Sequence, residues 1–539
     1  MARIPLSLGS YTDRSIIANC QRCLNLFPRE NPKDYPVPYT FYPTPGTIGL
    51  STPPTAGRGR GLYRATNNIL YSVVGSSLYK VGSDWSYKLL GTLTSGATTP
   101  VSMADNGTTM MLVDGSAKGY TIGLYTDSFA PISSPAFYGA DRVDCVDAFF
   151  VLNKPATGQF YCTLANSTTF DPLYYATKIG FADKLASIIV SHREIWLIGE
   201  STTEVWVNSG AADFPFQIMT GSFIEHGCAA KYSIAKMGDA VFWLSRDLQG
   251  QCVVVKGQGY QAARISTHAI ETAIAKYKMI DDAVAFTYQQ EGHQFYVLSF
   301  PSADATWVYD QTSGLWHERC FLDSNGVERR HRGNSSAFAY GKNVTVDWQN
   351  GALYALDLDT YTDVGNPIIR RRGFPHLGNG GNRVFYSQFL ADMEVGTATG
   401  TTTAAAIQAL WTEADFSNVI LGDSVTDLLL DGVAQDTYLM TDGGVSVVLA
   451  DDIDEFLIAF DLADAGPPAP QVWLRWSDTR GATWSNPIAA DLGGGGEYLR
   501  SVQFQRLGMA RDRVFELFWS YPAKTALNGA FISMTTGKS

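Results

Sequence analysis

The chain has 539 residues, of which 45% are hydrophobic and 17% are charged, and its formal net charge is −12. This length predicts two or three domains, and this composition excludes extensive disorder. The acidic balance argues against a protein that grips nucleic acid through its phosphates, because such proteins present a basic face.

A hairpin rich in aromatic and β-branched residues recurs along much of the chain. Its turns carry Gly, Ser, Asn and Asp, which supply positive φ angles or local side-chain hydrogen bonds. A short alternating strand precedes several hairpins, at 101–104, 185–191, 232–237 and 283–288. The hairpins begin near Tyr71, Met110, Phe149, Ile195, Val241, Phe295 and Val344.

This recurrence predicts an all-β fold with a β-propeller over residues 55–372. A period of about 40–50 residues with several strands per unit is typical of propeller blades. One small sheet cannot bury both faces alone, whereas radial stacking covers those faces and leaves only short edges. We predict seven blades, alternatively six, and a β-sandwich with irregular insertions is the competing fold.

Two features interrupt or precede the hairpins. Residues 1–54 are expected to be an extended segment that closes the propeller or contacts neighbouring subunits. Within the repeats, Thr267–Tyr277 places Ile270 and Ile274 on one apolar stripe, with Ser266 or Thr267 available as a cap. This pattern predicts one helix packed between blades.

After Arg372 the pattern changes, which predicts a C-terminal β domain formed by residues 373–396 and 467–539. Residues 397–466 are interpreted as a β-rich insertion whose short apolar runs end in acidic or Gly turns. The insertion lacks the G-G-x-G-x-D order of calcium-binding repeats. Four alternating segments predict an antiparallel, sandwich-like C-terminal domain: Phe385–Glu394, Gln471–Trp476, Tyr498–Arg506 and Val514–Ser520.

No catalytic, cofactor-binding or metal-binding residue is predicted. Cys20 and Cys23 form a C-x-x-C, but the chain lacks the second pair of a zinc ribbon, and all seven Cys are expected to be reduced thiols. No two His residues have metal-site spacing, and no nucleophile elbow or P-loop occurs. No apolar stretch approaches the roughly 18 residues of a membrane helix, so no membrane insertion is expected.

Two basic runs and one turn motif need an interpretation. The runs, Arg329–Arg332 and Arg370–Arg372, are expected to be solvated loops or ion-paired interface rims. The segment Ser477–Trp484 resembles the Asp-box hairpin of sialidases (S-x-D-x-G-x-T-W), with Thr479 at the Asp position. The box is a structural turn, and it occurs once, outside the propeller region, so it gives no support to a glycosidase.

Several long blocks occur in a recognisable order: Asn25–Glu30 followed by Tyr42–Gly46, Val101–Asp114, His192–Trp206, Phe223–Ala230, Arg264–Glu271, Tyr288–Ser299, Trp307–Glu318 and Arg506–Glu516. With these blocks the chain resembles the packaged-DNA stabilisation proteins of short-tailed bacteriophages, also described as tail nozzle or tail hub proteins. The resemblance covers nearly the whole chain except the insertion.

The resemblance implies a structural protein of the virion tail that has no catalytic residues. It implies a ring, typically a homohexamer, below the portal and its adaptor, which closes the channel after packaging and extends it for DNA ejection. The implied partners are other copies of the chain, the head–tail adaptor, and tail fibres or tailspikes. Genomic DNA would pass without specific binding, and an acidic lumen would repel its phosphates. Synthesis and assembly are expected in the host cytoplasm.

Two other functions compete with this one. A tail-borne carbohydrate-binding or glycosidase-like propeller would need solvent-facing aromatic residues beside carboxylates at the propeller mouth. The Trp candidates, for each of which packing in a blade core is the expected role, are Trp206, Trp307, Trp316 and Trp348. A cellular propeller that serves as a scaffold for protein partners is the third reading.

Overall fold

The structure is a computed structural model of the chain. It describes residues 1–6, 9–35, 37–211, 213–246, 249–250, 252–395, 470–493 and 501–536, and six short strands between 410 and 458. Strands dominate this part of the chain. The helices described are α1 (His268–Ala275) and the short 3₁₀ helix η1 (Pro301–Ala303).

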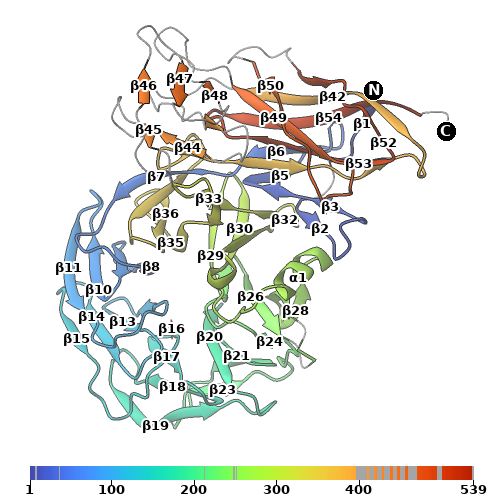
Figure 1. The fold of residues 1–539 in the computed structure, drawn as a ribbon. Helices are drawn as coiled ribbons and strands as arrows, with labels where there is room; N and C mark the ends of the chain where they lie inside the picture. Colours follow the sequence, from blue (N-terminus) through green and yellow to red (C-terminus); the bar gives the residue numbers. More distant parts are fainter. Residues whose placement is uncertain are drawn as a thin grey trace.

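Seven β-sheets of the described chain, built mainly of antiparallel strands, stand in a ring (Figure 1). The first sheet contains β8 (Gly59–Arg64), β9 (Leu70–Val74), β10 (Ser77–Val81) and β11 (Tyr87–Thr92). The second contains β12 (Ser102–Asp105), β13 (Thr109–Val113), β14 (Gly119–Gly123) and β15 (Phe129–Pro131). The third contains β16 (Val143–Val146), β17 (Phe149–Asn153), β18 (Gln159–Thr163) and β19 (Phe170–Thr177). The fourth contains β20 (Leu185–Ser191), β21 (Glu194–Gly199), β22 (Thr203–Asn208) and β23 (Phe216–Ile218).

The fifth sheet contains β24 (Gly227–Cys228), β25 (Ala235–Met237), β26 (Ala240–Arg246), β27 (Cys252–Gln258) and β28 (Gln261–Arg264). The sixth begins with β29 (Val284–Gln290), β30 (His293–Phe300), β31 (Ala305–Asp310) and β32 (Leu315–Glu318). The seventh combines β35 (Gly333–Ala339), β36 (Lys342–Asp347) and β37 (Leu353–Asp357) with β7 (Gly46–Ser51), β38 (Thr362–Asp363) and β39 (Asn366–Pro367).

The first strands of neighbouring sheets contact one another around the ring, and β35 of the seventh sheet contacts β8 of the first. The ring is closed by β7, which comes from far upstream and pairs antiparallel with β37. Six sheets are therefore built from consecutive segments, and the seventh is a composite. The propeller prediction is confirmed, because every expected hairpin forms the two middle strands of one sheet.

The alternation of side chains explains why these sheets stack. In β13, Met110 and Leu112 enter the core shared with the first sheet, whereas Met111 and Val113 enter the core shared with the third. Because successive residues of a strand point to opposite faces, a continuous apolar run buries both faces of a blade. Each of the seven junctions between neighbouring sheets in the described residues holds such a cluster.

The predicted helix is present and is slightly shorter than expected. It begins after Thr267, whose side chain accepts a hydrogen bond from the backbone N–H of Ile270 at 3.4 Å. Ile270 and Ile274 are buried in the core between the fifth and sixth sheets. The cap and the apolar stripe read from the sequence are therefore both observed.

A β-sandwich packs beside the propeller and contains the expected C-terminal strands. One of its sheets contains β1 (Ala2–Arg3), β5 (Leu26–Glu30), β6 (Tyr39–Pro43), β42 (Val384–Val395), β51 (Val502–Gln505), β52 (Met509–Ala510) and β54 (Thr525–Thr536). The facing strands are β4 (Cys23–Leu24), β40 (Arg370–Gly373), β41 (Leu377–Gly378), β49 (Gln471–Ser477), β50 (Ile488–Asp491) and β53 (Asp512–Trp519). The core between them includes Phe389, Phe515 and Leu517.

The propeller and the sandwich are joined by one continuous sheet. In it β32 of the sixth blade pairs parallel with β4, β4 pairs with β40, and β40 pairs with β53. Two small ribbons lie apart from it, β2 (Tyr11–Thr12) with β3 (Cys20–Gln21) and β33 (Cys320–Leu322) with β34 (Glu328–Arg330). Residues 1–54 thus contribute strands to both the propeller and the sandwich.

The predicted insertion lies mostly outside the described residues. The strands placed within it form two three-stranded ladders: β43 (Leu410–Trp411), β44 (Asn418–Leu421) and β45 (Leu428–Leu429), then β46 (Tyr438–Met440), β47 (Ser446–Leu449) and β48 (Phe456–Ile458). Most of these short strands coincide with the apolar runs that end in acidic or Gly turns.

Candidate functional site

The shared sheet carries a chain of ion pairs from the propeller into the sandwich. Arg22, between β3 and β4, pairs with Glu318 on β32 and with Glu328 on β34, each at 2.9 Å. Arg371 on β40 pairs with Glu328 at 2.9 Å and with Glu516 on β53 at 3.4 Å. Each charged residue in the middle of this series of ion pairs therefore has two partners of opposite charge.

Arg475 on β49 is the last member of this series of ion pairs, and its Nη2 lies 2.6 Å from a carboxylate oxygen of Glu516. We call these residues the joint ladder: Arg22, Glu318, Glu328, Arg371, Arg475 and Glu516. Burial by itself would raise the pKa of Glu328, but Arg22 and Arg371 outweigh that effect and hold the pKa below its ordinary value. The ladder therefore favours the charged form of Glu328 in the folded chain.

Beneath the ladder lies Arg370, a fully buried guanidinium. Arg370 donates to the carbonyl oxygens of Tyr361 at 3.2 Å and of Tyr521 at 3.3 Å. Burial lowers its pKa to about 10, so the side chain remains charged at neutral pH. A guanidinium offers five donors in one plane, which lets a single residue hold several loops together.

Arg372, two residues further along β40, is also fully buried. It donates to the carbonyl oxygen of Gly9 at 3.0 Å and to the Gln21 side chain at 2.9 Å. Its guanidinium lies over the ring of Phe41, 4.5 Å from the centroid. Arg372 thus fastens the N-terminal segment to the sandwich by hydrogen bonds and by a cation–π contact.

The prediction for the two basic runs was only partly right. Arg329, Arg332 and Arg371 are ion-paired, as one of the two readings expected. The prediction is wrong for the interior members of the runs, which are Arg330, His331, Arg370 and Arg372. Arg330 lies 4.2 Å from the centroid of the Trp348 ring, and burial lowers its pKa to about 10. In β40, the alternation of side chains along the strand turns Arg370 and Arg372 inward although both are basic.

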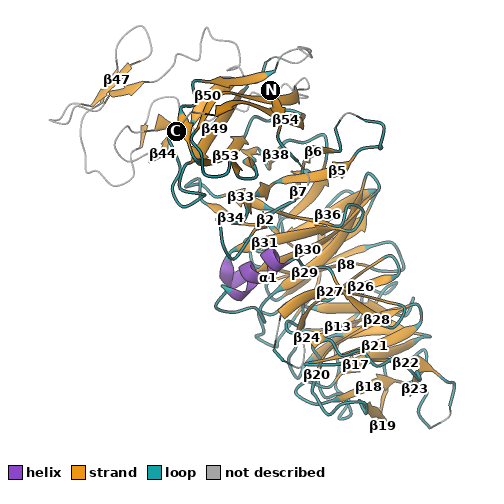
Figure 2. Cartoon of the chain, turned by 90° about the vertical axis from the view of Figure 1, so that its right-hand side faces the viewer, coloured by secondary structure: helices purple, strands orange, loops and turns teal. Residues whose placement is uncertain are grey.

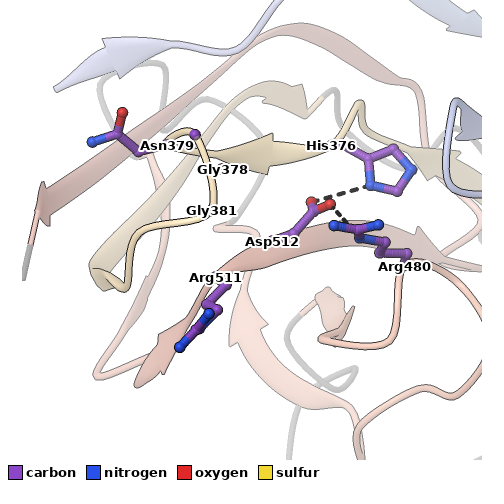
Figure 3. Close-up of a pocket in the computed structure, with 8 residues that line it drawn as sticks. His376, Gly378, Asn379, Gly381, Arg480, Arg511 and Asp512 are labelled. Carbon is purple, nitrogen blue, oxygen red and sulfur yellow. Dashed lines mark hydrogen bonds and ion pairs between the residues drawn. The ribbon is translucent and has the colours of Figure 1, made fainter. Parts of the chain in front are cut away.

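A second polar cluster lies where the N-terminal segment meets the sandwich (Figure 3). His376 Nδ1 is 3.1 Å from Asp512 Oδ1, and Arg480 Nε is 2.8 Å from Asp512 Oδ2. On the other side of the ring, His376 Nε2 is 2.9 Å from the carbonyl oxygen of Ile16 and 3.7 Å from Cys20 Sγ. The cluster therefore brings together a thiol, an imidazole and a carboxylate, the residue types of a catalytic triad.

The hydrogen bonds of this cluster do not match those of a triad. A carbonyl oxygen can only accept, so His376 Nε2 must donate its proton to Ile16 and cannot also act as a base toward the thiol. Burial, and then the charges of Asp512 and Glu516, raise the pKa of Cys20 to about 11, whereas a nucleophilic cysteine needs a lowered pKa. The arrangement anchors the N-terminal segment through the Ile16 carbonyl.

The other motifs have structural roles. Cys23 donates to the carbonyl oxygen of Leu26, and burial raises its pKa to about 12. In the Asp-box segment, Ser477 Oγ accepts from the backbone N–H groups of Thr479 and Gly481, which makes the expected turn. Trp484 stacks on Arg475 of the joint ladder, 4.7 Å from the guanidinium carbon.

The Trp residues considered as a sugar-binding platform are in the propeller interior. Trp206, Trp307 and Trp316 are buried, and Trp348 is half-buried beneath Arg330. Among the residues that the structure describes, no three His, Cys, Asp or Glu side chains are arranged to hold a metal ion. No helix in the described ranges is both long enough and apolar enough to cross a membrane.

The fold and the joint define the chain as a propeller fused to a β-sandwich through one shared sheet. The chain belongs to the family described as "Bacteriophage P22 Gp10, beta-propeller", whose model matches residues 2–361. Membership in this family makes it a phage structural protein of the DNA-stabilisation class. The matched range contains the N-terminal strands and the propeller ring as far as β37, and it ends just before β38 and β39 of the seventh sheet.

Several solved structures match the chain at low similarity. BamB from Moraxella catarrhalis is 10% identical, with 58% of this chain and 97% of that chain covered and a TM-score of 0.37. A streptogramin B lyase is 9% identical, with 58% and 97% covered and a TM-score of 0.40. A chain of the mitotic checkpoint complex is 10% identical, with 58% and 94% covered and a TM-score of 0.39. These scores are too low to bear on function, and no curated protein matches the sequence.

Proposed function

We propose that this chain is the tail nozzle of a short-tailed bacteriophage. In this role it closes the portal–adaptor channel after packaging, retains the DNA and conducts it outward during ejection. Family membership supports the phage role, and the joint is the structural observation that supports the nozzle. The proposal includes a virion location and assembly in the host cytoplasm.

A plug that retains DNA must resist force without bending between its parts. Backbone hydrogen bonds run from β29 of the propeller to β50 of the sandwich in one sheet. Glu516 in the joint ladder is 4% exposed, so its two ion pairs are shielded from solvent more than ordinary surface pairs. Both features support a joint that transmits load as one body.

The nozzle is proposed to be a ring of copies, with six as the family-based number. Figure 2 shows an elongated molecule with the sandwich at one end and β19 at the other. Near β19 several large apolar side chains are exposed, and we call them the tip patch: Leu173, Tyr175, Ile179, Phe181 and Phe223. A concentration of exposed apolar residues is typical of an assembly surface, and a neighbouring copy is its proposed occupant.

The remaining proposed partners are the head–tail adaptor and the tail fibres or tailspikes. DNA is proposed to pass through the ring without specific binding. The net charge of −12 supports this, because an acidic wall gains no counterion-release energy from phosphates. Solvent-facing tryptophans, which the carbohydrate-binding alternative needs, are not found among its four candidates.

The decisive experiment compares particles assembled with and without this chain. Particles filled with DNA but lacking the chain should lose their DNA to added nuclease, and adding back the purified protein should restore protection. An add-back variant with Leu173→Lys and Ile179→Lys should protect poorly, while Leu89→Lys, at an exposed residue on β11, serves as the matched control. Full nuclease protection in particles without the chain would contradict the proposal.

A further inference from the structure

A pocket of about 380 Å³ opens on the sandwich beside the His376 cluster (Figure 3). One wall is the tight turn after β41, and the other is formed by the Asp-box turn and the start of β53. The lining residues are His376, Gly378, Asn379, Gly380, Gly381, Arg480, Arg511 and Asp512. None of them belongs to the joint ladder or to the tip patch.

The charges lining this pocket do not cancel. Asp512 is the one carboxylate among the lining residues, and it is already engaged by His376 and by Arg480. Arg511 is exposed and has no ion pair or hydrogen bond within the part of the chain that the structure describes. The lining residues therefore carry one surplus positive charge in a protein that is acidic as a whole.

The backbone on both walls adopts conformations that most residues avoid. Arg480 has a φ of +60°, in the left-handed region that is costly for a residue with a Cβ. Gly380 and Gly381 have φ angles of +56° and +82°, and a Cβ added at either would meet nothing within 4 Å. Glycine adopts these angles without strain, so the turn leaves open space above its glycines, whereas Arg480 is a strained residue of the kind found at binding sites.

We infer that this pocket binds a compact oxyanion, the phosphate or carboxylate group of a ligand, with Arg511 as the recognising guanidinium. A planar guanidinium matches both groups through two parallel N–H···O hydrogen bonds. Room remains beside Asn379 and the glycine turn for the part of the ligand that carries the anion. This inference stands independently of the proposed nozzle function.

The test titrates the full-length protein with inorganic phosphate and, separately, with glucuronate, at constant ionic strength and with calorimetric detection. Saturable binding of phosphate points to a phosphate ester as the ligand, and preference for glucuronate points to an acidic sugar or carboxylate side chain. In both cases Arg511→Gln should weaken binding about tenfold or more, because a charge-assisted pair is lost. Arg511→Lys should retain only part of the affinity, since lysine keeps the positive charge but lacks the planar pair of N–H donors of a guanidinium.

The control is Arg383→Gln, at a nearby exposed arginine that does not line the pocket. It should bind both anions as the unchanged protein does, and Arg511→Gln should keep the unchanged unfolding midpoint because Arg511 has no partner to lose. Absence of saturable binding to either anion would overturn the inference. Equal weakening by Arg383→Gln and Arg511→Gln would also overturn it, because the attraction would then be diffuse.

Discussion

The joint ladder predicts that its two central acids differ in their contribution to stability. Glu328 is shared by Arg22 and Arg371, each of which keeps a second partner if Glu328 becomes Gln. No guanidinium is then left unpaired, so Glu328→Gln should cost about 1 kcal/mol. The shape of the side chain is retained, so packing changes little.

Glu516→Gln should cost more, about 2–3 kcal/mol. The side chain is 4% exposed, and its removal leaves Arg475 without an acid in the ladder. Breaking a buried pair costs about 3–5 kcal/mol when the remaining charge stays buried. Arg475 is 27% exposed and Arg371 keeps Glu328, so partial solvation reduces the penalty.

Urea unfolding followed by tryptophan fluorescence measures both variants, and the midpoint of Glu516→Gln should be lower than that of Glu328→Gln. A cycle that combines Glu516→Gln with Arg475→Met should recover part of the loss, because no unpaired charge remains. Equal midpoints, or a larger effect at Glu328, would refute the reasoning that the orphaned guanidinium dominates.

Three further predictions follow from particular contacts. A Cβ at Gly257 would lie 2.7 Å from the Trp243 ring and 2.8 Å from the Trp196 ring, so Gly257→Ala should cost about 1–3 kcal/mol in urea unfolding; Gly49→Ala, where the nearest atom is 3.6 Å away, is the control. Because the pKa of Glu328 is lowered on folding, its contribution is present above the unfolded value of 4.5 and is lost as pH falls through the folded pKa. Acid titration of the unfolding midpoint should therefore show a smaller decline for Glu328→Gln, and an unchanged decline would contradict this assignment. Cys20, with a pKa raised to about 11, should react with iodoacetamide at pH 8 more slowly than a free thiol, as measured by mass spectrometry. Faster labelling would instead support a catalytic triad of Cys20, His376 and Asp512.

The propeller was predictable because its information is local. The run from Met110 to Val113 is apolar throughout and short, and such a run between Gly-rich turns indicates a strand buried on both faces. Thr267 and the Ile270–Ile274 stripe likewise predicted α1, and only its final residues were misplaced. Closure of the propeller was one of the two roles expected for residues 1–54, but the strand β7 and its partner β37 were not predicted, because they lie about three hundred residues apart.

The joint could not be read from the sequence for the same reason. Arg22 and Glu318 are adjacent only in the fold, and no local pattern links them. Arg370 and Arg372 were assigned to the surface because arginine is rarely buried without a partner, and their partners are carbonyl oxygens of distant loops. Three consecutive arginines show no alternation in the sequence, so the inward positions of Arg370 and Arg372 are visible only in the folded strand β40.

The late closure of the ring sets an order of events during synthesis. Strand β7 leaves the ribosome early and has no antiparallel partner until β37 has been synthesised. Strand β6 can pair with β54 only later still, when the last of the described strands has emerged. Contacts between such distant segments make folding slow, because the entropy of closing a long loop is lost before the contacts contribute any stabilising free energy. A nascent chain therefore carries unpaired strand edges until almost all of it has emerged, and chaperone protection during that interval would decide how much protein matures.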